Sequence, residues 1–147
     1  MPKKFTKNFL ASEVLKYLAE NKLMSLATSS KNGGPWASTL FFAFDKNLNI
    51  LFFSRPDTRH CKNILKNPRV ALTINQNWGG LGSIKGLQIS GVARRPMKNE
   101  YKKYYAIYKK RYSWADKFPD HAIYVIEPTE VHFINQEIFG HFFRVKI

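Results

Sequence analysis

Cysteine and acidic residues are scarce in this chain, and each shortage removes a class of structure. Cys61 is the only cysteine among 147 residues, which excludes an intramolecular disulfide framework and a zinc site built from several cysteines. It also favours a reducing compartment, so we predict a cytoplasmic protein. With only ten Asp and Glu, the sequence offers no paired carboxylates for acid–base catalysis. The four histidines show no metal-ligand spacing, so we predict no metal site.

A long hydrophobic run is also missing. The apolar stretch at residues 10–23 is interrupted by Glu13, Lys16 and Glu20, so we predict neither a signal peptide nor a membrane span, and no membrane partner. No internal repeat and no Pro/Ser-rich linker divides the sequence. We therefore predict a single domain over residues 1–147, long enough to bury a core without disulfides or metals.

Positive charge is what the chain has in excess. The formal net charge is +14, from 24 Lys and Arg against ten acids. Such a field attracts polyanions, including nucleic acids and phosphorylated small molecules. Solvated surface lysines are the alternative interpretation. A basic β-barrel that binds nucleic acid is therefore one hypothesis for this chain.

Hydrophobic spacing predicts more strands than helices. One helix is expected at residues 8–21, and a second after Pro96, where tyrosines recur at helical spacing from Tyr101 to Tyr112. Gly86 and Gly91 predict bulges in a long strand. Short strands are expected in hairpin order at residues 23–28, 36–44, 48–54, 69–75, 84–95, 122–127, 130–135 and 141–147. This pattern predicts a mainly β (β+α) fold, a small antiparallel barrel with flanking helices.

The segment from Ser54 to Lys62 carries the clearest chemistry. A strand ends at Ser54, Pro56 breaks it, and Thr58 is expected to cap a short helix that stops before Pro68. The start of a helix presents free backbone N–H groups and the positive end of the dipole. Hydroxyl groups and cations gather around this start, from Ser54, Arg55, Thr58, Arg59, His60 and Lys62. Together they predict a phosphate site, and the alternative is a capped helix with a solvated basic face.

Several stretches carry a resemblance to a known family: residues 24–28, the segment from Ser54 through Thr58-Arg59-His60 to residues 67–72, residues 88–93 and Phe139-Gly140. They resemble the pyridoxamine 5′-phosphate oxidase-like FMN-binding split barrels, and the resemblance covers about half of the chain. Thr58-Arg59-His60 and Phe139-Gly140 are similar to an uncharacterised branch of that superfamily. It implies a six- or seven-stranded antiparallel split β-barrel with flanking helices. It also implies a homodimer, with the flavin held between two subunits.

The resemblance further implies where FMN is bound. The phosphate would lie against the end of the third strand and the helix start, and the isoalloxazine along the second strand. The implied contacts are Ser38, Thr39, Leu40, Phe42, Phe53, Ser54, Thr58, Arg59, His60 and Lys62. Trp78, beside two glycines, is a candidate wall for the flavin ring or an anchor for its loop.

Four positions depart from the family's oxidases. His60 stands where they have Lys, Ser38 where they have Arg, Ala43 where they have the substrate-phosphate Lys, and Gly86 near their flavin-contacting Gln. We therefore do not expect oxidation of pyridoxamine phosphate, although FMN binding and redox chemistry on another small molecule remain the favoured function. No catalytic side chain is assigned. Deazaflavin or haem could replace FMN, with His141 as a candidate haem ligand.

Overall fold

A closed antiparallel sheet forms the centre of the structure, a computed structural model that describes residues 4–76, 79–140 and 144–147. Its strands are β1 (Leu23–Ser29), β2 (Pro35–Phe44), β3 (Ile50–Ser54), β4 (Arg69–Asn75), β5 (Lys85–Arg94), β6 (Ala122–Asn135) and β7 (Arg144–Lys146). They follow the order β3-β2-β1-β4-β5-β6-β7, and β3 also pairs with β6. This additional pairing closes six strands into a barrel and leaves β7 outside it. The predicted antiparallel barrel is confirmed.

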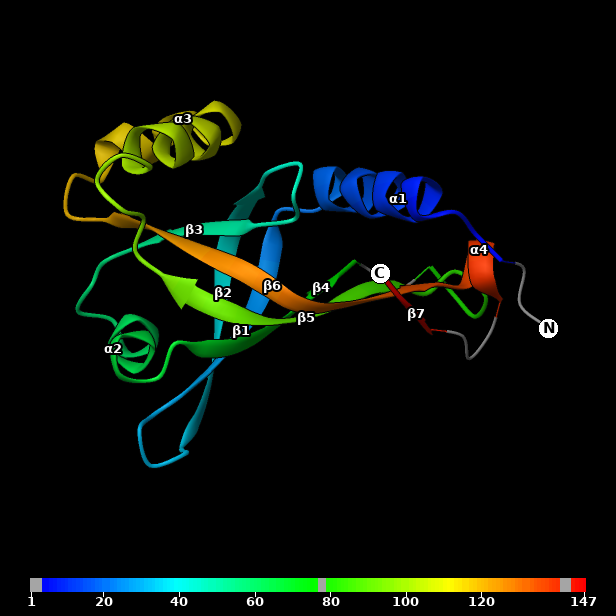
Figure 1. Ribbon diagram of the computed structural model, residues 1–147, viewed down its shortest axis with the longest axis horizontal. Helices are drawn as coiled ribbons and strands as arrows, with labels where there is room; N and C mark the ends of the chain where they lie inside the picture. The colour runs from blue at the N-terminus through cyan, green and yellow to red at the C-terminus, as the bar shows by residue number, and fades with distance from the viewer. Residues whose placement is uncertain (1–3, 77–78, 141–143) are drawn as a thin grey trace.

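Helices cover the barrel from two sides. They are α1 (Lys7–Glu20), α2 (Arg59–Lys66), α3 (Tyr101–Arg111), α4 (Gln136–Phe139) and the 3-10 helix η1 (Ser113–Lys117). In Figure 1, α1 and α3 lie on one side of the sheet with the β2–β3 turn between them, and α2 lies on the other side. None of the helices in the described part of the chain is long and apolar enough to cross a membrane.

The two strands predicted at residues 122–127 and 130–135 are one continuous strand, β6, and this prediction was wrong. Pro128 has no N–H for the sheet ladder, but it lies opposite Gly91, where the register between β5 and β6 shifts. A Cβ at Gly91 would lie 2.6 Å from the carbonyl oxygen of Glu127. The glycine therefore lets the two backbones approach at this bulge, as the sequence predicted for Gly91.

The turn between β2 and β3 explains why β3 begins at Ile50 and not at residue 48. The carboxylate of Asp45 accepts hydrogen bonds from the backbone N–H groups of Asn47 and Asn49 at 2.9 and 3.0 Å and from the Asn49 amide at 2.8 Å. Leu48 adopts a positive φ of 64°, which belongs to a turn and not to a strand. Asp45 thus stabilises a compact turn, and this turn includes residues 48 and 49, which were expected to belong to the strand.

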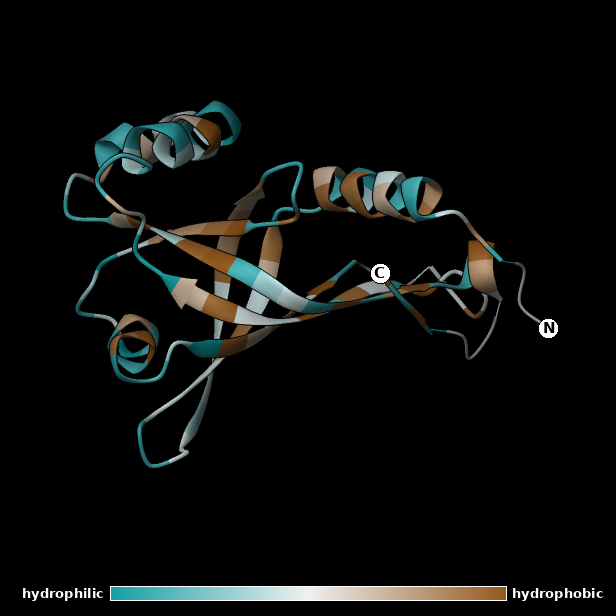
Figure 2. Ribbon diagram, viewed as in Figure 1, coloured by the Kyte–Doolittle hydropathy of each residue, from teal (hydrophilic) through white to brown (hydrophobic). Residues whose placement is uncertain are grey.

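Side chains pack in two hydrophobic clusters, and β3 contributes to both. Ile50 and Phe52 point into the barrel, where they belong to the same cluster as the buried side chains of α1. Leu51 and Phe53 point outward and are covered by the tyrosines of α3. Alternate side chains of a strand face opposite sides of a sheet, so a strand covered on both faces is apolar throughout, as the brown colour of β3 shows in Figure 2. Ser54 is the polar residue that ends this buried strand.

Candidate functional site

The end of β3 and the start of α2 bring the predicted hydroxyl groups together. Ser54 Oγ lies 3.4 Å from Thr58 Oγ1. Thr58 occupies the N-cap position, as predicted, but its hydroxyl donates to the carbonyl oxygen of Arg55 at 2.9 Å and makes no capping bond to the helix. The amides of Arg59, His60 and Cys61 have no carbonyl acceptor within α2 because they belong to its first turn. The helix start therefore presents N–H groups beside two hydroxyls.

His60 is the centre of a buried hydrogen-bond cluster. Its Nε2 atom lies 2.8 Å from Ser54 Oγ and 3.2 Å from Thr58 Oγ1, and its Nδ1 atom lies 3.3 Å from Ser38 Oγ. Only 8% of the residue is exposed. A hydroxyl can donate or accept, so both ring nitrogens of a neutral imidazole are satisfied. Ser38 and His60 therefore contact each other. Both are positions at which this chain differs from the oxidases.

Burial lowers the pKa of His60 below its ordinary value of 6.5. In the unfolded chain the imidazole takes up a proton near that value, whereas in the folded protein it does so only at lower pH. The folded state therefore binds fewer protons in this window, and stability is lost as the pH falls from about 6.5 toward the folded pKa.

Replacing His60 by glutamine should reduce this acid sensitivity, because an amide does not titrate. Melting temperatures of the wild-type protein and of His60→Gln, measured from pH 5 to pH 8, should converge at the acid end. Carboxylates and other histidines contribute equally to both proteins, so the difference isolates His60. Parallel curves would show that His60 is not held neutral by the fold.

Arg59 and Arg55 differ in their partners. Arg55 lies 2.6 Å from a carboxylate oxygen of Asp57 and 3.7 Å from one of Asp120. The Arg59 guanidinium lies 4.1 Å from the ring centroid of Trp36 on β2, a cation–π contact. Among the residues that the structure describes, no carboxylate lies within ion-pair distance of Arg59. Arg59 is thus a cation at the helix start whose charge no carboxylate in the described residues neutralises.

The second strand has an edge without a strand partner beside this site. Residues 35–41 of β2 pair with β1, whereas β3 pairs only with residues 42–44. Ser38 and Leu40 are half-buried and Thr39 is exposed on this part of β2. Figure 1 shows the β1–β2 hairpin extending beyond the barrel on the side of α2. The backbone of the Ser38–Leu40 stretch is therefore accessible next to the helix start.

Phe42 and Phe53 lie apart from this accessible surface. The Phe42 side chain is fully buried in the barrel. The backbone N–H of Phe42 donates to the carbonyl oxygen of Lys22, and the backbone carbonyl oxygen of Phe42 accepts from the Tyr112 hydroxyl at 2.6 Å. Phe53 packs beneath α3, with its ring centroid 5.4 Å from that of Tyr108. The structure therefore does not bring these two side chains to the cluster around His60.

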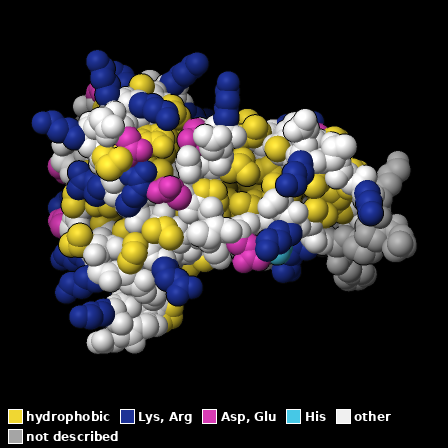
Figure 3. Space-filling model, viewed as in Figure 1, with side chains coloured by type: hydrophobic (Ala, Val, Ile, Leu, Met, Phe, Trp, Pro, Cys, Tyr) yellow, Lys and Arg dark blue, Asp and Glu magenta, His cyan; other side chains and the backbone are white. Residues whose placement is uncertain are grey.

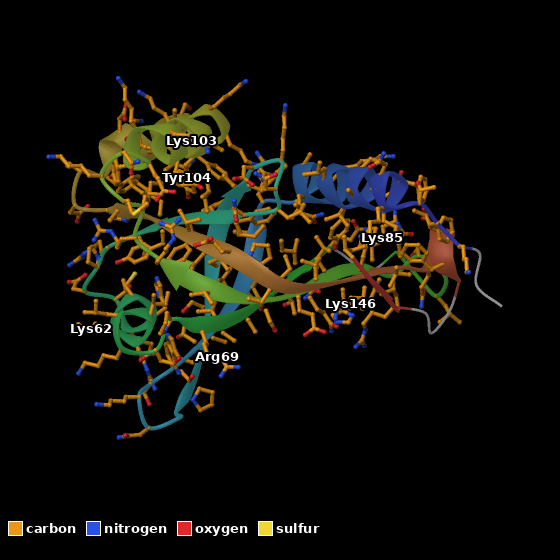
Figure 4. All side chains as sticks on the ribbon, in the orientation of Figure 1. Lys62, Arg69, Lys85, Lys103, Tyr104 and Lys146 are labelled. Atoms are coloured by element: carbon orange, nitrogen blue, oxygen red, sulfur yellow. The ribbon has the colours of Figure 1, made fainter. Side chains whose placement is uncertain are left out.

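The remaining predicted residues occupy varied positions. Lys62 is exposed on the outer side of α2 (Figure 4). Trp78 and His141 lie outside the described residues. Ala43, at the position of the substrate-phosphate Lys, is 1% exposed and packs beneath α3. In the described ranges no three His, Cys, Asp or Glu side chains are grouped as metal ligands.

Trp36 is the residue near the site that our sequence reasoning missed. It is 41% exposed at the beginning of β2, and Arg59 stacks on its ring. The available signal was its spacing from Ser38, since residues two apart on a strand share one face. Trp78 is the more conspicuous tryptophan in the sequence because it lies beside two glycines.

Comparison with known sequences identifies a family profile and a relative that this chain resembles. The sequence profile described as "Pyridoxamine 5′-phosphate oxidase" matches residues 10–135. A UPF0306 protein of Pasteurella multocida is 31% identical over 101 residues, which cover 68% of this chain and 67% of that protein.

Two solved structures share the fold at low sequence identity. A haem-binding protein from Mycobacterium smegmatis superposes with a TM-score of 0.78 at 20% identity, covering 93% of this chain, which spans only 57% of that protein's length. The haem storage protein HutZ from Vibrio cholerae superposes with a TM-score of 0.74 at 21% identity, covering 88% of this chain and 95% of that one. At these identities the likeness concerns the fold alone.

Proposed function

This chain belongs to the pyridoxamine 5′-phosphate oxidase family, and from that premise we propose that it binds FMN with its phosphate at the start of α2. The observation that carries the proposal is the convergence of Ser54, Thr58 and the first amides of α2, next to Arg59. We further propose that the protein is a flavin-dependent oxidoreductase acting on a small organic molecule.

The groups at the helix start fit a phosphate monoester. The uncapped amides, the Arg59 guanidinium and the Ser54 hydroxyl can donate to it, the Thr58 hydroxyl beside them donates to the Arg55 carbonyl oxygen, and the helix dipole favours an anion at this end. The nearest acid in sequence, Asp57, is paired with Arg55. His60 lies behind the hydroxyls and fixes the positions of Ser54 and Thr58. It would hold the donors in place while Arg59 supplies the charge.

The accessible edge of β2 is the proposed support for the isoalloxazine. Backbone groups of Ser38, Thr39 and Leu40 would contact the ring, and Trp36 and Arg59 would form a rim between ring and phosphate. When bound, FMN supplies hydride or electron transfer. The residues of this chain bind and orient it, and none is assigned as a proton donor or acceptor for the substrate.

The substrate differs from pyridoxamine phosphate in this proposal. Ala43 is buried beneath α3 and Gly86 is buried within β5, so neither position can supply the Lys or Gln that the oxidases use. The oxidases' substrate-phosphate Lys is thus missing at position 43, and their flavin-contacting Gln is missing near position 86. The substrate class stays undefined beyond a small organic molecule.

A second copy of the chain is the proposed partner. The outer face of β1, β4 and β5 carries small side chains, including Ser25, Ala27, Ala71 and Ser90, around a hollow of about 350 Å³. Small residues let two sheets approach closely, and a flavin site between subunits would need such contact. Sedimentation velocity should give twice the mass of the 17.1 kDa chain; a monomer at micromolar concentration would contradict the dimer.

Titration with FMN tests the proposed function. The purified protein should be yellow or become so on reconstitution, quench FMN fluorescence with one site per chain, and bind with micromolar affinity or better. A Soret absorption band without flavin binding would indicate that the cofactor is haem and not FMN. Salt-sensitive binding of nucleic acid by a colourless protein, again without flavin binding, would favour the basic-barrel hypothesis.

A further inference from the structure

A cleft of about 680 Å³ lies between α1, α3 and the β2–β3 turn. Figure 1 shows this turn rising between the two helices. The volume is within the range typical of small-molecule sites. The cleft shares no lining residue with the cluster around His60. It is therefore a separate feature of the molecule, independent of the proposed flavin site.

The floor of the cleft lies at the seam between the two hydrophobic clusters. Leu15 and Phe44 are half-buried against the barrel cluster, and Ile107 is half-buried against the cluster beneath α3. Ala43, a buried member of the cluster beneath α3, also lines the cleft. Each cluster thus leaves apolar surface uncovered at the same place. A ligand with an apolar body would bury this surface.

The rim of the cleft is basic. Lys103, Ile107, Lys110 and Arg111 lie on one face of α3, at helical spacing, and Lys46 lies opposite on the turn. In the described part of the chain, none of these three lysines forms an ion pair. Figures 3 and 4 show Lys and Arg side chains projecting from the edge of the molecule that carries α3, where Lys103 is labelled.

The one acid in the lining does not neutralise this rim. The carboxylate of Asp45 already accepts three hydrogen bonds from the turn that it organises. The Arg111 guanidinium donates to backbone carbonyls of α1 and β2 and adds a fixed positive charge at the end of the cleft. Four cations therefore surround an apolar floor together with one carboxylate that is committed to the turn.

From this combination we propose that the cleft binds a long-chain carboxylate, with the acyl chain on Leu15, Phe44 and Ile107 and the carboxylate between Lys103 and Lys110. An apolar body suits the floor and one negative charge suits the rim. A nucleic acid would leave the floor exposed. A neutral lipid would cover the floor but leave the lysines of the rim without a charged partner.

Fluorescence titration with cis-parinarate, a long-chain polyene carboxylate, tests the proposal below the micelle concentration. The protein should bind one probe per chain with micromolar affinity, and cis-parinarate methyl ester should bind more weakly. Lys103→Gln/Lys110→Gln should weaken binding of the carboxylate about five- to thirtyfold. Lys102→Gln/Lys117→Gln removes the same charge from exposed positions outside the cleft and should leave the affinity unchanged.

Methyl NMR of isoleucine-labelled protein locates the probe. The Ile107 signal should shift on titration, while Ile89, inside the barrel, should not. Equal affinities of the two double variants, equal affinities of acid and ester, or an unshifted Ile107 would each overturn the proposal. Because no step uses FMN, the outcome stands apart from the success or failure of the flavin titration.

Discussion

Replacing Arg111 by methionine should lower the free energy of unfolding by about 2–4 kcal/mol, because it removes several charge-assisted hydrogen bonds at once. The guanidinium donates to Phe42 O and Leu18 O at 3.2 Å and to the carbonyl oxygen of Asn21. It also lies 4.9 Å from the Phe42 ring centroid. One side chain of α3 therefore ties the end of α1 to β2.

The loss of stability exceeds that for an ordinary surface contact because the backbone carbonyls that accept from Arg111 remain in place without this donor. The last turn of α1 has carbonyls with no partner inside the helix, and Arg111 satisfies them. Burial lowers the pKa of Arg111 from its usual value, which is the direction expected when a cation is held by neutral carbonyls and not by a carboxylate. Methionine fills similar space but donates no hydrogen bond.

Urea denaturation of wild-type protein and Arg111→Met measures this effect. Lys110→Met is the matched control, since the neighbouring lysine is exposed on the same helix and its loss should change stability by less than about 0.5 kcal/mol. A midpoint for Arg111→Met equal to that of the control would mean that α1 and α3 do not depend on this link.

Replacing Arg59 by alanine should weaken FMN binding by about 1–3 kcal/mol, because one charge-assisted contact to the phosphate is lost. Arg59 has no carboxylate partner in the described residues, so no ion pair within the protein neutralises its charge. Its cation–π contact with Trp36 restricts the guanidinium to the side of the helix that faces β2. The side chain is thus positioned before the ligand arrives.

Lys66→Ala provides the control for Arg59→Ala. Lys66 is exposed in the last turn of the same helix, so its removal changes the net charge equally but leaves the helix start intact. We expect its FMN affinity to stay within twofold of wild type, a difference of about 0.4 kcal/mol. If both variants lose affinity equally, the effect is general electrostatics and Arg59 has no specific contact.

The sequence predicted the local elements because their signals are local. Alternating apolar residues marked the strands, and Pro56, Thr58 and Pro68 marked the bounds of α2. The break predicted near Pro128 failed for a non-local reason. Proline normally interrupts a ladder, but here Gly91 on the neighbouring strand supplies a bulge that accommodates it. A rule that reads one strand at a time could not anticipate that partner.

Contacts across the barrel were likewise hidden from the sequence. Ser38 and His60 were each recognised as departures from the oxidases, yet their contact depends on the pairing of β2 with β3 and on the direction of α2. Phe42 was expected to contact the ring because it lies on the correct strand. Its hydrogen bonds come from Tyr112, which caps the end of α3, and from the segment before β1, and no strand pattern reveals them.

The proposed phosphate anchor at the start of α2 is tested most directly by comparing the binding of FMN with that of riboflavin. The two ligands share the isoalloxazine and the ribityl chain, and only FMN carries the phosphate. Isothermal titration of the wild-type protein should show FMN binding at least tenfold more tightly than riboflavin, a difference of about 1.4 kcal/mol or more. Equal affinities would contradict the account, because the helix start would then contribute nothing to binding.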